Sequence, residues 1–197
     1  MSSTVAGVVL AAGTSSRMGR NKLLLTLDGE TLVRGAARRA LAGGLSPVIV
    51  VLGSEAERLA AELDGVGCQI ATNPDFASGM ASSLRTGVAA VPATSTAAMM
   101  LLADMPFVTP EMIGAMIGRY DETRAALVIS DYAGVTAPPV LYDRSLFTEL
   151  LAGTGDRGAQ QVVERHRGQA QIMTWPAAAL VDIDHPEDCA RRGLYYR

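Results

Sequence analysis

A short loop near the N-terminus carries the residue types and spacing with the clearest chemical potential in this sequence. It follows an apolar run, residues 5–10, which predicts a buried strand. The loop, residues 11–22, opens with Ala-Ala-Gly and contains Arg17, Arg20 and Lys22. Small side chains let a ligand approach backbone N–H groups, and the cations can neutralise a polyphosphate. The loop therefore indicates a phosphate-binding site, although a plain connection with solvated charges explains it equally well.

Two well-known nucleotide-binding motifs do not fit this loop. The P-loop needs a hydroxyl residue directly after its lysine, whereas Leu23 follows Lys22. The dinucleotide fingerprint Gly-x-Gly-x-x-Gly is absent, because Ala11 and Ser16 stand where its outer glycines would be. A redox role with a nicotinamide cofactor is therefore disfavoured.

Two aspartates far along the chain can supply the acidic part of such a site. Asp104 directly follows an apolar run, residues 97–103, which predicts another strand. Ligands of open α/β sheets bind beyond the carboxyl ends of the strands, so Asp104 and the first loop should converge. Asp184 can join them, or it can simply cap a final helix. Magnesium is the natural bridge between such carboxylates and phosphate oxygens.

A third polar group stands at the expected start of a helix over residues 80–91. Residues 73–79 predict a loop by their turn-forming types, and Ser82 and Ser83 follow it. A helix N-terminus with hydroxyl groups beside the first loop suits the polar groups of a ligand. Simple capping by the serines explains the spacing as well.

The order of the predicted elements gives the fold class. Strands are expected over residues 5–10, 47–52, 68–71, 97–103 and 125–130, and helices over 31–42, 54–63, 80–91, 109–120, 145–151 and 159–166. Continuous apolar strands that alternate with amphipathic helices predict a doubly wound α/β sheet. Ser54 and Glu57 have the spacing of a capping box. Pro138 and Pro139 argue against a regular central strand over residues 137–142, although its last three residues can pair.

Composition and charge narrow the range of partners. The chain has 197 residues, of which 49% are hydrophobic and 19% charged, and we expect one domain over residues 1–197. Its net charge of −3 argues against nucleic acid or an anionic membrane as a partner. Cys68 and Cys189 have no metal or redox spacing and are expected to be buried thiols. With no long apolar run and no signal-peptide layout, a cytoplasmic location is expected.

Five segments of the chain occur in a recognisable order. They are Leu10-Ala11-Ala12-Gly13 with Arg17, Gly19 and Lys22; Asn73-Pro74 with Gly79-Met80 and Ser82-Ser83; Leu102-Ala103-Asp104-Met105-Pro106; Gly155-Asp156-Arg157-Gly158; and Asp182-Ile183-Asp184 with Pro186. With these segments the chain resembles the molybdenum cofactor cytidylyltransferase family, which is related to the molybdopterin guanylyltransferases. The resemblance implies a three-layer, Rossmann-like nucleotidyltransferase fold, with a mostly parallel sheet and one antiparallel strand.

The resemblance also implies an activity and a set of site residues. The activity is magnesium-dependent transfer of CMP from CTP to the phosphate of molybdopterin, with release of pyrophosphate, and a molybdoenzyme apoprotein is a further expected partner. Nucleotide binding would fall to Leu10, Ala11, Ala12, Gly13, Arg17, Lys22, Ser82 and Ser83, catalysis to Arg17, Lys22 and Asp104, and magnesium binding to Asp104 and Asp184.

Two positions bear on the finer assignment. Family members that transfer CMP usually have alanine at the position of Ala12, whereas those that transfer GMP usually have glycine, so CTP is favoured. Residues 137–140 read Ala-Pro-Pro-Val where relatives commonly carry Gly-His-Pro-Val. This departure leaves a sugar or alcohol phosphate open as the acceptor. A non-catalytic nucleotide-binding maturation factor of a molybdoenzyme also stays open.

Overall fold

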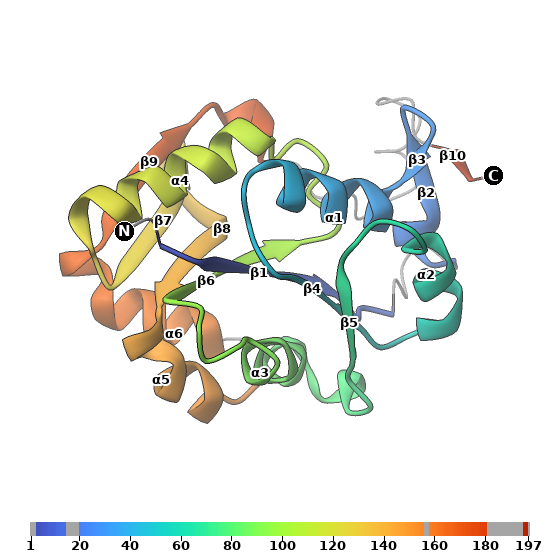
Figure 1. The fold of residues 1–197 in the computed structure, drawn as a ribbon, viewed down its shortest axis with the longest axis horizontal. Helices are drawn as coiled ribbons and strands as arrows, with labels where there is room; N and C mark the ends of the chain where they lie inside the picture. The colour runs from blue at the N-terminus through green and yellow to red at the C-terminus, as the bar shows by residue number, and fades with distance from the viewer. Residues whose placement is uncertain (1–2, 15–19, 156–157, 181–194, 197) are drawn as a thin grey trace.

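A seven-stranded sheet forms the centre of the molecule (Figure 1). The computed structural model describes residues 3–14, 20–155, 158–180 and 195–196. The strands lie in the order β5-β4-β1-β6-β8-β7-β9; β8 is antiparallel to both neighbours, and the other pairs are parallel. Their bounds are β1 Val5–Ala11, β4 Val48–Leu52, β5 Gln69–Thr72, β6 Ala97–Leu102, β7 Leu127–Tyr132, β8 Val135–Asp143 and β9 Gln171–Trp175. The predicted fold class is confirmed.

Helices cover both faces of the sheet and give three layers (Figure 1). The helices α1 (Leu32–Ala42), α2 (Ala56–Glu62) and α4 (Pro110–Thr123) contribute to the core on one face. The helices α3 (Met80–Ala89), α5 (Phe147–Ala152) and α6 (Gly158–His166) contribute to the core on the other. Short 3-10 turns lie at Lys22–Leu24, Phe76–Ser78, Arg144–Leu146, Arg167–Gln169 and Ala177–Ala179.

A small second sheet follows the first loop. It consists of β2 (Leu25–Leu27), β3 (Glu30–Thr31) and β10 (Tyr195–Tyr196), in the order β10-β2-β3, with antiparallel pairing. Asp28 and Gly29 form the turn between β2 and β3, and both have positive φ, 52° and 84°. This geometry matches the right-handed twist of a two-residue hairpin. The predicted turn is present, but the sequence patterns did not indicate these very short strands.

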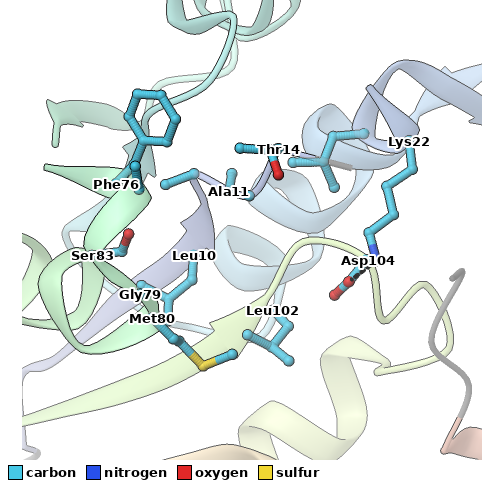
Figure 2. A pocket seen from close by; sticks show the side chains of 14 residues that line it. Leu10, Ala11, Thr14, Lys22, Phe76, Gly79, Met80, Ser83, Leu102 and Asp104 are labelled. Carbon is cyan, nitrogen blue, oxygen red and sulfur yellow. Dashed lines mark ion pairs between the residues drawn. The ribbon is translucent and has the colours of Figure 1, made fainter. Parts of the chain in front are cut away.

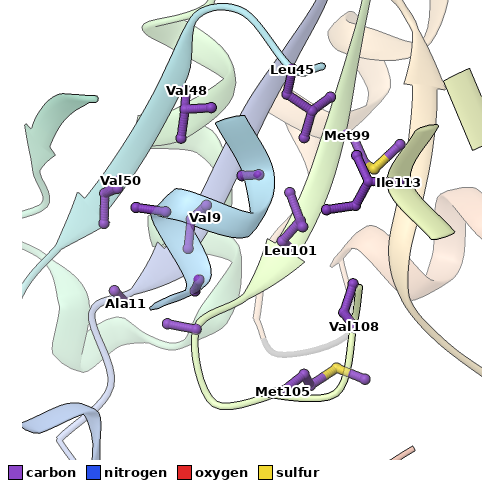
Figure 3. Packing of buried hydrophobic residues seen from close by; sticks show 14 of the residues in the cluster. Val9, Ala11, Leu45, Val48, Val50, Met99, Leu101, Met105, Val108 and Ile113 are labelled. Atoms are coloured by element: carbon purple, nitrogen blue, oxygen red, sulfur yellow. The ribbon is translucent and has the colours of Figure 1, made fainter. Parts of the chain in front are cut away.

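The strands of the parallel part are apolar throughout because both of their faces are buried. On β1, Val9 faces the α1 side of the core, whereas Val8 packs on the α3 side. Figure 3 shows Val9 together with Val50 and Leu101 of the neighbouring strands in the first of these clusters. The alternation along each strand therefore places residues in two cores rather than in one core and solvent.

Helix α3 lies unusually close to the sheet. A Cβ atom added to Gly87 would lie 2.3 Å from Cγ1 of Val8 and 3.0 Å from Cγ2 of Val51. Only glycine leaves room for this approach to β1 and β4. The close packing brings the C-terminal part of α3 against the middle of β1 and against β4.

The predicted capping box at α2 is wrong. Glu55 is the N-cap residue, in the left-handed conformation (φ 51°), and no side-chain hydrogen bond caps the helix. The backbone N–H of Ser54 instead donates to the carbonyl oxygen of Ala12 at 3.3 Å. Because the chain turns at Ser54 to meet the first loop, the helix begins one residue later than the capping box requires.

The prediction for residues 137–142 is confirmed, because the strand is irregular at its two prolines while residues 140–142 pair with both neighbours. Strand β8 lies between β6 and β7, and its pairing with β7 shifts between Ile129 and Ser130, so the ladder skips the two prolines. Two hydroxyl groups of β7 satisfy the bulge: Ser130 donates to the carbonyl oxygen of Pro139 at 2.7 Å, and Tyr132 to that of Pro138 at 2.8 Å. Prolines are tolerated inside a sheet at such bulges.

The structure also tests part of the expectations about the cysteines and about membrane-spanning segments. Cys68 is free and half-buried, and burial raises the pKa of its thiol, while Cys189 lies outside the described residues. Within the described ranges, every helix is too short or too polar to cross a membrane.

Candidate functional site

A cavity of about 550 Å³ lies at the carboxyl ends of β1 and β6 (Figure 2). It joins the first loop, the segment that leads into α3 and the end of β6. Its wall consists of Leu10, Ala11, Ala12, Gly13, Thr14, Lys22, Leu23, Phe76, Ala77, Gly79, Met80, Ser83, Leu102 and Asp104. Three segments that are far apart in the sequence therefore meet where the strand-end rule for α/β sheets places a ligand.

A close ion pair forms one end of this cavity. The Nζ atom of Lys22 lies 2.6 Å from Oδ2 of Asp104, and the two side chains are only 15% and 20% exposed. Lys22 begins a 3-10 turn whose cap is Asn21, because the Oδ1 atom of Asn21 accepts a hydrogen bond from the N–H of Leu23 at 3.1 Å. Partial burial strengthens the attraction between the charges relative to bulk water. The first loop and the end of β6 thus share one cleft.

The residue that follows β6 is hydrogen-bonded to β1, directly before Asp104. The N–H of Ala103 donates to the carbonyl oxygen of Leu10 at 3.1 Å, and the N–H of Met105 donates back to Leu102 at 3.3 Å. These bonds continue the parallel pairing one step beyond the strand and then turn the chain. The Asp104 carboxylate therefore has a defined place on the cavity wall.

The opposite end of the cavity contains Phe76 and Ser83 (Figure 2). Phe76 can lie there because Gly53 has no side chain. A Cβ atom on Gly53 would lie 2.6 Å from Cβ of Phe76 and 2.9 Å from Cβ of Ala12. The aromatic ring, the methyl group of Ala12 and the end of β4 therefore pack at one point, which gives this end an apolar wall.

The side chain of Asn73 forms hydrogen bonds to both serines at the start of α3. This buried side chain donates from Nδ2 to Oγ of Ser82 at 2.8 Å and to Oγ of Ser83 at 3.0 Å. Its Oδ1 atom accepts the N–H of Asp75 at 3.0 Å, which fixes which end of the amide is the oxygen. The amide therefore acts as a donor toward both hydroxyl groups.

The two serines differ in whether the hydroxyl hydrogen is still available to a ligand. Ser82 donates its own hydrogen to the carbonyl oxygens of Asp75 and Gly79, at 3.0 and 2.8 Å. Ser83 accepts from Asn73, and within the described part of the chain its hydroxyl hydrogen has no acceptor. Because Ser83 lines the cavity and Ser82 does not, Ser83 is the hydroxyl that can donate to a ligand.

The structure brings most of the predicted site residues together. Those that line the cavity are Leu10, Ala11, Ala12, Gly13, Lys22, Ser83 and Asp104. Ser82 is directed to the backbone instead, while Arg17 and Asp184 lie outside the described residues. The roles of all these residues stay predictions.

Asp104 is the described side chain best placed to hold a metal ion. Residues 3–14, 20–155, 158–180 and 195–196 contain no cluster of three or more His, Cys, Asp or Glu side chains that could bind one. Magnesium often needs only one or two carboxylates when phosphate oxygens complete its shell. A lone Asp104 on the cavity wall therefore fits magnesium that arrives with a nucleotide.

Three features of the site were not given a role from the sequence. Asn73 was placed in a loop, but its amide bonds depend on the fold and leave no local pattern. Phe76 follows it in the same loop and could have been noticed as an aromatic residue next to a candidate site. Gly53 ends an apolar strand without any marker of the contact that it permits.

Comparison with known proteins gives the family. The sequence matches the family described as the MobA-like NTP transferase domain over residues 7–170. The chain is 29% identical to the purine catabolism protein PucB of Bacillus subtilis, over 95% of this chain and 96% of that protein. It is 26% identical to the molybdenum cofactor cytidylyltransferase of Escherichia coli, over 92% and 91% of the two chains.

Two further similarities bear on function and fold. The nicotine blue oxidoreductase of Paenarthrobacter nicotinovorans is 36% identical over 70% of this chain and 66% of that protein. The crystal structure of Rv0371c from Mycobacterium tuberculosis in complex with manganese superposes with a TM-score of 0.81, at 26% identity, over 96% and 97% of the two chains. The match with the family extends from residue 7 in β1 to residue 170, directly before β9, and includes every residue of the cavity wall. This chain belongs to the MobA-like NTP transferase family.

Proposed function

We propose that this protein transfers CMP from CTP to the phosphate of a pterin acceptor, molybdopterin, and releases pyrophosphate. The observation that carries the proposal is the Lys22–Asp104 pair at one end of a cavity whose other end is apolar and offers the Ser83 hydroxyl. A triphosphate at the charged end would leave the base and ribose at the other. The similarity to the Escherichia coli molybdenum cofactor cytidylyltransferase along most of the chain supports the acceptor.

The proposed reaction is an in-line displacement. An oxygen of the acceptor phosphate forms a bond to the α-phosphorus of CTP, and the bond from that phosphorus to the bridging oxygen of the β-phosphate breaks. The electron pair leaves with pyrophosphate. The acceptor phosphate is already anionic, so no general base is required. The demand on the protein is to hold two anions together and to neutralise the charge that develops on the leaving group.

Lys22 and Asp104 meet this demand in different ways. Lys22 supplies a positive charge next to the phosphates, with Arg17 as a second predicted cation. Asp104 would hold magnesium, with Asp184 as the predicted second ligand. When bound, magnesium neutralises phosphate oxygens and polarises them. The manganese complex of Rv0371c supports a divalent cation in this fold.

The choice of CTP rests on Ala12. Its methyl group lies in the cavity wall next to Gly53 and Phe76, where a base would pack. The Ser83 hydroxyl can donate to a keto oxygen or ring nitrogen of a pyrimidine. The Ala12 methyl group occupies space that a glycine would leave open, so it favours a base without the second ring of a purine.

The decisive experiment is calorimetric titration of the four NTPs in the presence of magnesium, followed by an assay of pyrophosphate release. We expect CTP to bind most tightly and pyrophosphate to appear only when molybdopterin is added. Preference for GTP would contradict the cytidylyl assignment. Binding of CTP without release of pyrophosphate with any acceptor would instead indicate a nucleotide-binding maturation factor.

Two alternatives are tested with the same protein. A sugar or alcohol phosphate is favoured as the acceptor by the Ala-Pro-Pro-Val sequence at residues 137–140, and a panel of such phosphates in the release assay tests it. An oxidoreductase function is favoured by the similarity to nicotine blue oxidoreductase. Titration with NADH and NADPH tests it, and tight binding of either would contradict the transferase proposal.

A further inference from the structure

A separate cavity of about 300 Å³ lies beside α1 and shares no wall residue with the cavity at the ends of β1 and β6. Its wall comes from the β2–β3 hairpin, from α1 and from the segment that follows Asp104. Leu27, Leu32 and Phe107 are its large apolar residues. A cavity of this size has room for a small organic molecule.

Arg39 is the one basic residue in the wall of this cavity. Its Nη2 atom is buried and has no hydrogen-bond partner among the described residues. Burial lowers the pKa of the Arg39 guanidinium, and the negative charge of Glu30 opposes this only in part. An arginine still carries its charge at neutral pH, and a buried charge without a partner is costly. The unpaired Nη2 atom therefore requires an explanation.

The other two arginines of α1 have partners within the protein. Arg34 donates to two carbonyl oxygens around the C-terminus of α2, at 2.7 and 3.1 Å. Arg38 forms an ion pair with Glu30, so this acidic residue of the cavity wall is already engaged. Arg39 is thus the arginine of this helix whose charge the described residues leave uncompensated.

Gly35 determines where the Arg39 guanidinium lies. A Cβ atom added to Gly35, one helical turn before Arg39, would lie 2.9 Å from Nη1 of Arg39. Glycine inside a helix is less favourable than alanine, but here it lets the guanidinium lie against the helix surface. The charged group is therefore held at the cavity wall.

We propose that this cavity binds a small organic carboxylate, whose oxygens pair with the Arg39 guanidinium while its apolar part lies against Leu32 and Phe107. The planar guanidinium matches the geometry of a carboxylate, and such a pair has strong, charge-assisted hydrogen bonds. The apolar wall residues favour an aliphatic or aromatic acid over a polyhydroxylated one. The proposal does not depend on the proposed function, since the two cavities have no residue in common.

The charges of the cavity wall favour a single negative charge on the ligand. Asp28 and Glu30 are its acidic residues, and they would repel a phosphate dianion more strongly than a carboxylate. Asp28 is exposed, so water and salt weaken its effect, whereas the partly buried Arg39 is screened less. A carboxylate is thus the anion that this combination of charges fits best.

The first test measures whether the protein itself already compensates Arg39. Arg39→Met keeps much of the apolar stem and removes the charge, so we expect the melting temperature to stay the same or to rise. Arg34→Met is the matched control and should lower it, because two hydrogen bonds at the end of α2 are lost. A lower melting temperature in Arg39→Met would show that the guanidinium is already stabilised, which would overturn the proposal.

The second test titrates benzoate and its neutral analogue benzamide by ligand-observed NMR. We expect benzoate to bind about tenfold more tightly, the scale of a hydrogen bond to a charged group. Arg39→Met should abolish this preference. Gly35→Ala should abolish it as well while the helix stays folded, because alanine is the better helix former and only the guanidinium must move. Arg58→Met, which removes an exposed arginine of α2, should keep the preference.

The outcomes separate this inference from the proposed function. Equal binding of benzoate and benzamide, a preference that survives in Arg39→Met or Gly35→Ala, or one that is lost in Arg58→Met would overturn it. Displacement of benzoate by CTP with magnesium would place benzoate in the other cavity, and displacement by inorganic phosphate would contradict the choice of a carboxylate. If CTP does not bind at all, the proposed function fails, and the Arg39 and Gly35 variants still decide whether the carboxylate site exists.

Discussion

The two halves of the central sheet differ in construction and in the chemistry at their edges. Strands β5, β4, β1 and β6 are parallel, and their ends carry the charged and hydroxyl groups of the larger cavity. Beyond β6 the antiparallel β8 interrupts the parallel pairing. A second pocket of about 60 Å³, lined mainly by α3, β6 and β8, lies on that side and is almost wholly apolar. Parallel strands direct their carboxyl ends to one edge, so polar loops gather there. The antiparallel β8 instead contributes residues from the interior of the strand to the wall of the smaller pocket.

The two halves offer different kinds of surface to a ligand. The parallel half offers charge complementarity and a donor in a fixed orientation, which suit a nucleotide. The half that begins at β8 offers a small and almost wholly apolar pocket. Under the proposed function, recognition of the nucleotide would therefore depend on charge complementarity and on the hydroxyl donor.

The largest effect should come from the charged end of the parallel half. We expect Lys22→Ala and Asp104→Asn each to lower turnover roughly 100-fold or more, the scale of losing one electrostatic stabiliser of a transition state. The measurement is pyrophosphate release at saturating CTP. Arg165→Gln is a matched control, because it removes the exposed ion pair with Glu149 in the other half of the molecule. Activity near the native level in either cleft variant would remove that residue from the proposed role.

A smaller effect should follow from closing the gap at Gly53. In Gly53→Ala the new methyl group would lie 2.6 Å from Cβ of Phe76, so the aromatic wall must shift. We expect the Kd for CTP to rise about tenfold, since overpacking typically costs about 1–3 kcal/mol. Calorimetry measures the Kd.

Gly87→Ala is the control for overpacking away from the cavity. Its methyl group would overlap Val8 and Val51, so the melting temperature should fall while the folded fraction binds CTP normally. If Gly53→Ala lowers stability as much as Gly87→Ala and leaves the Kd unchanged, the aromatic wall does not contribute to binding.

The same contrast explains what the sequence could predict. The continuous apolar runs of β1, β4 and β6 identify these strands to within a residue or two, because both faces are buried. Strand β9 was missed, since Gln171–Trp175 mixes polar and apolar residues and Ile172 is 51% exposed. The two prolines of β8 predict its irregularity, but the hydroxyl groups that satisfy the bulge come from β7 and leave no local pattern in the sequence.

The residues of the candidate site also differ in how far the sequence predicts their roles. The convergence of Lys22 and Asp104 follows from a topological rule that needs only strand order. The distinction between Ser82 and Ser83 does not, because both are serines at the start of a helix. It depends on the orientation of one buried amide, which only the positions of Asn73 and Asp75 reveal.

The difference between Ser82 and Ser83 gives the prediction with the next largest expected effect. Ser83→Ala should raise the Kd for CTP about fivefold, equivalent to roughly 1 kcal/mol for one neutral hydrogen bond, and should lower stability because the Asn73 amide loses one acceptor. Ser82→Ala should leave the Kd for CTP unchanged and lower stability more, since it removes the bonds to Asp75 and Gly79 as well as one from Asn73, but nothing in the cavity. Calorimetry and thermal unfolding of both variants measure the two effects. Equal effects of the two variants on the Kd would refute the assignment of Ser83 as the donor.

The smallest effect should be a change of base preference. Ala12→Gly removes a methyl group that packs beside Phe76 and Gly53 and so enlarges the apolar end of the cavity. We expect the ratio of CTP to GTP affinity to fall about threefold, in line with roughly 0.8 kcal/mol for one buried methyl-sized group. The measurement is paired titration of both nucleotides with magnesium. Because Ala12 belongs to the parallel half, the acceptor preference of the variant should not change. A shift in acceptor choice together with the base would mean that the two halves of the cleft do not act independently.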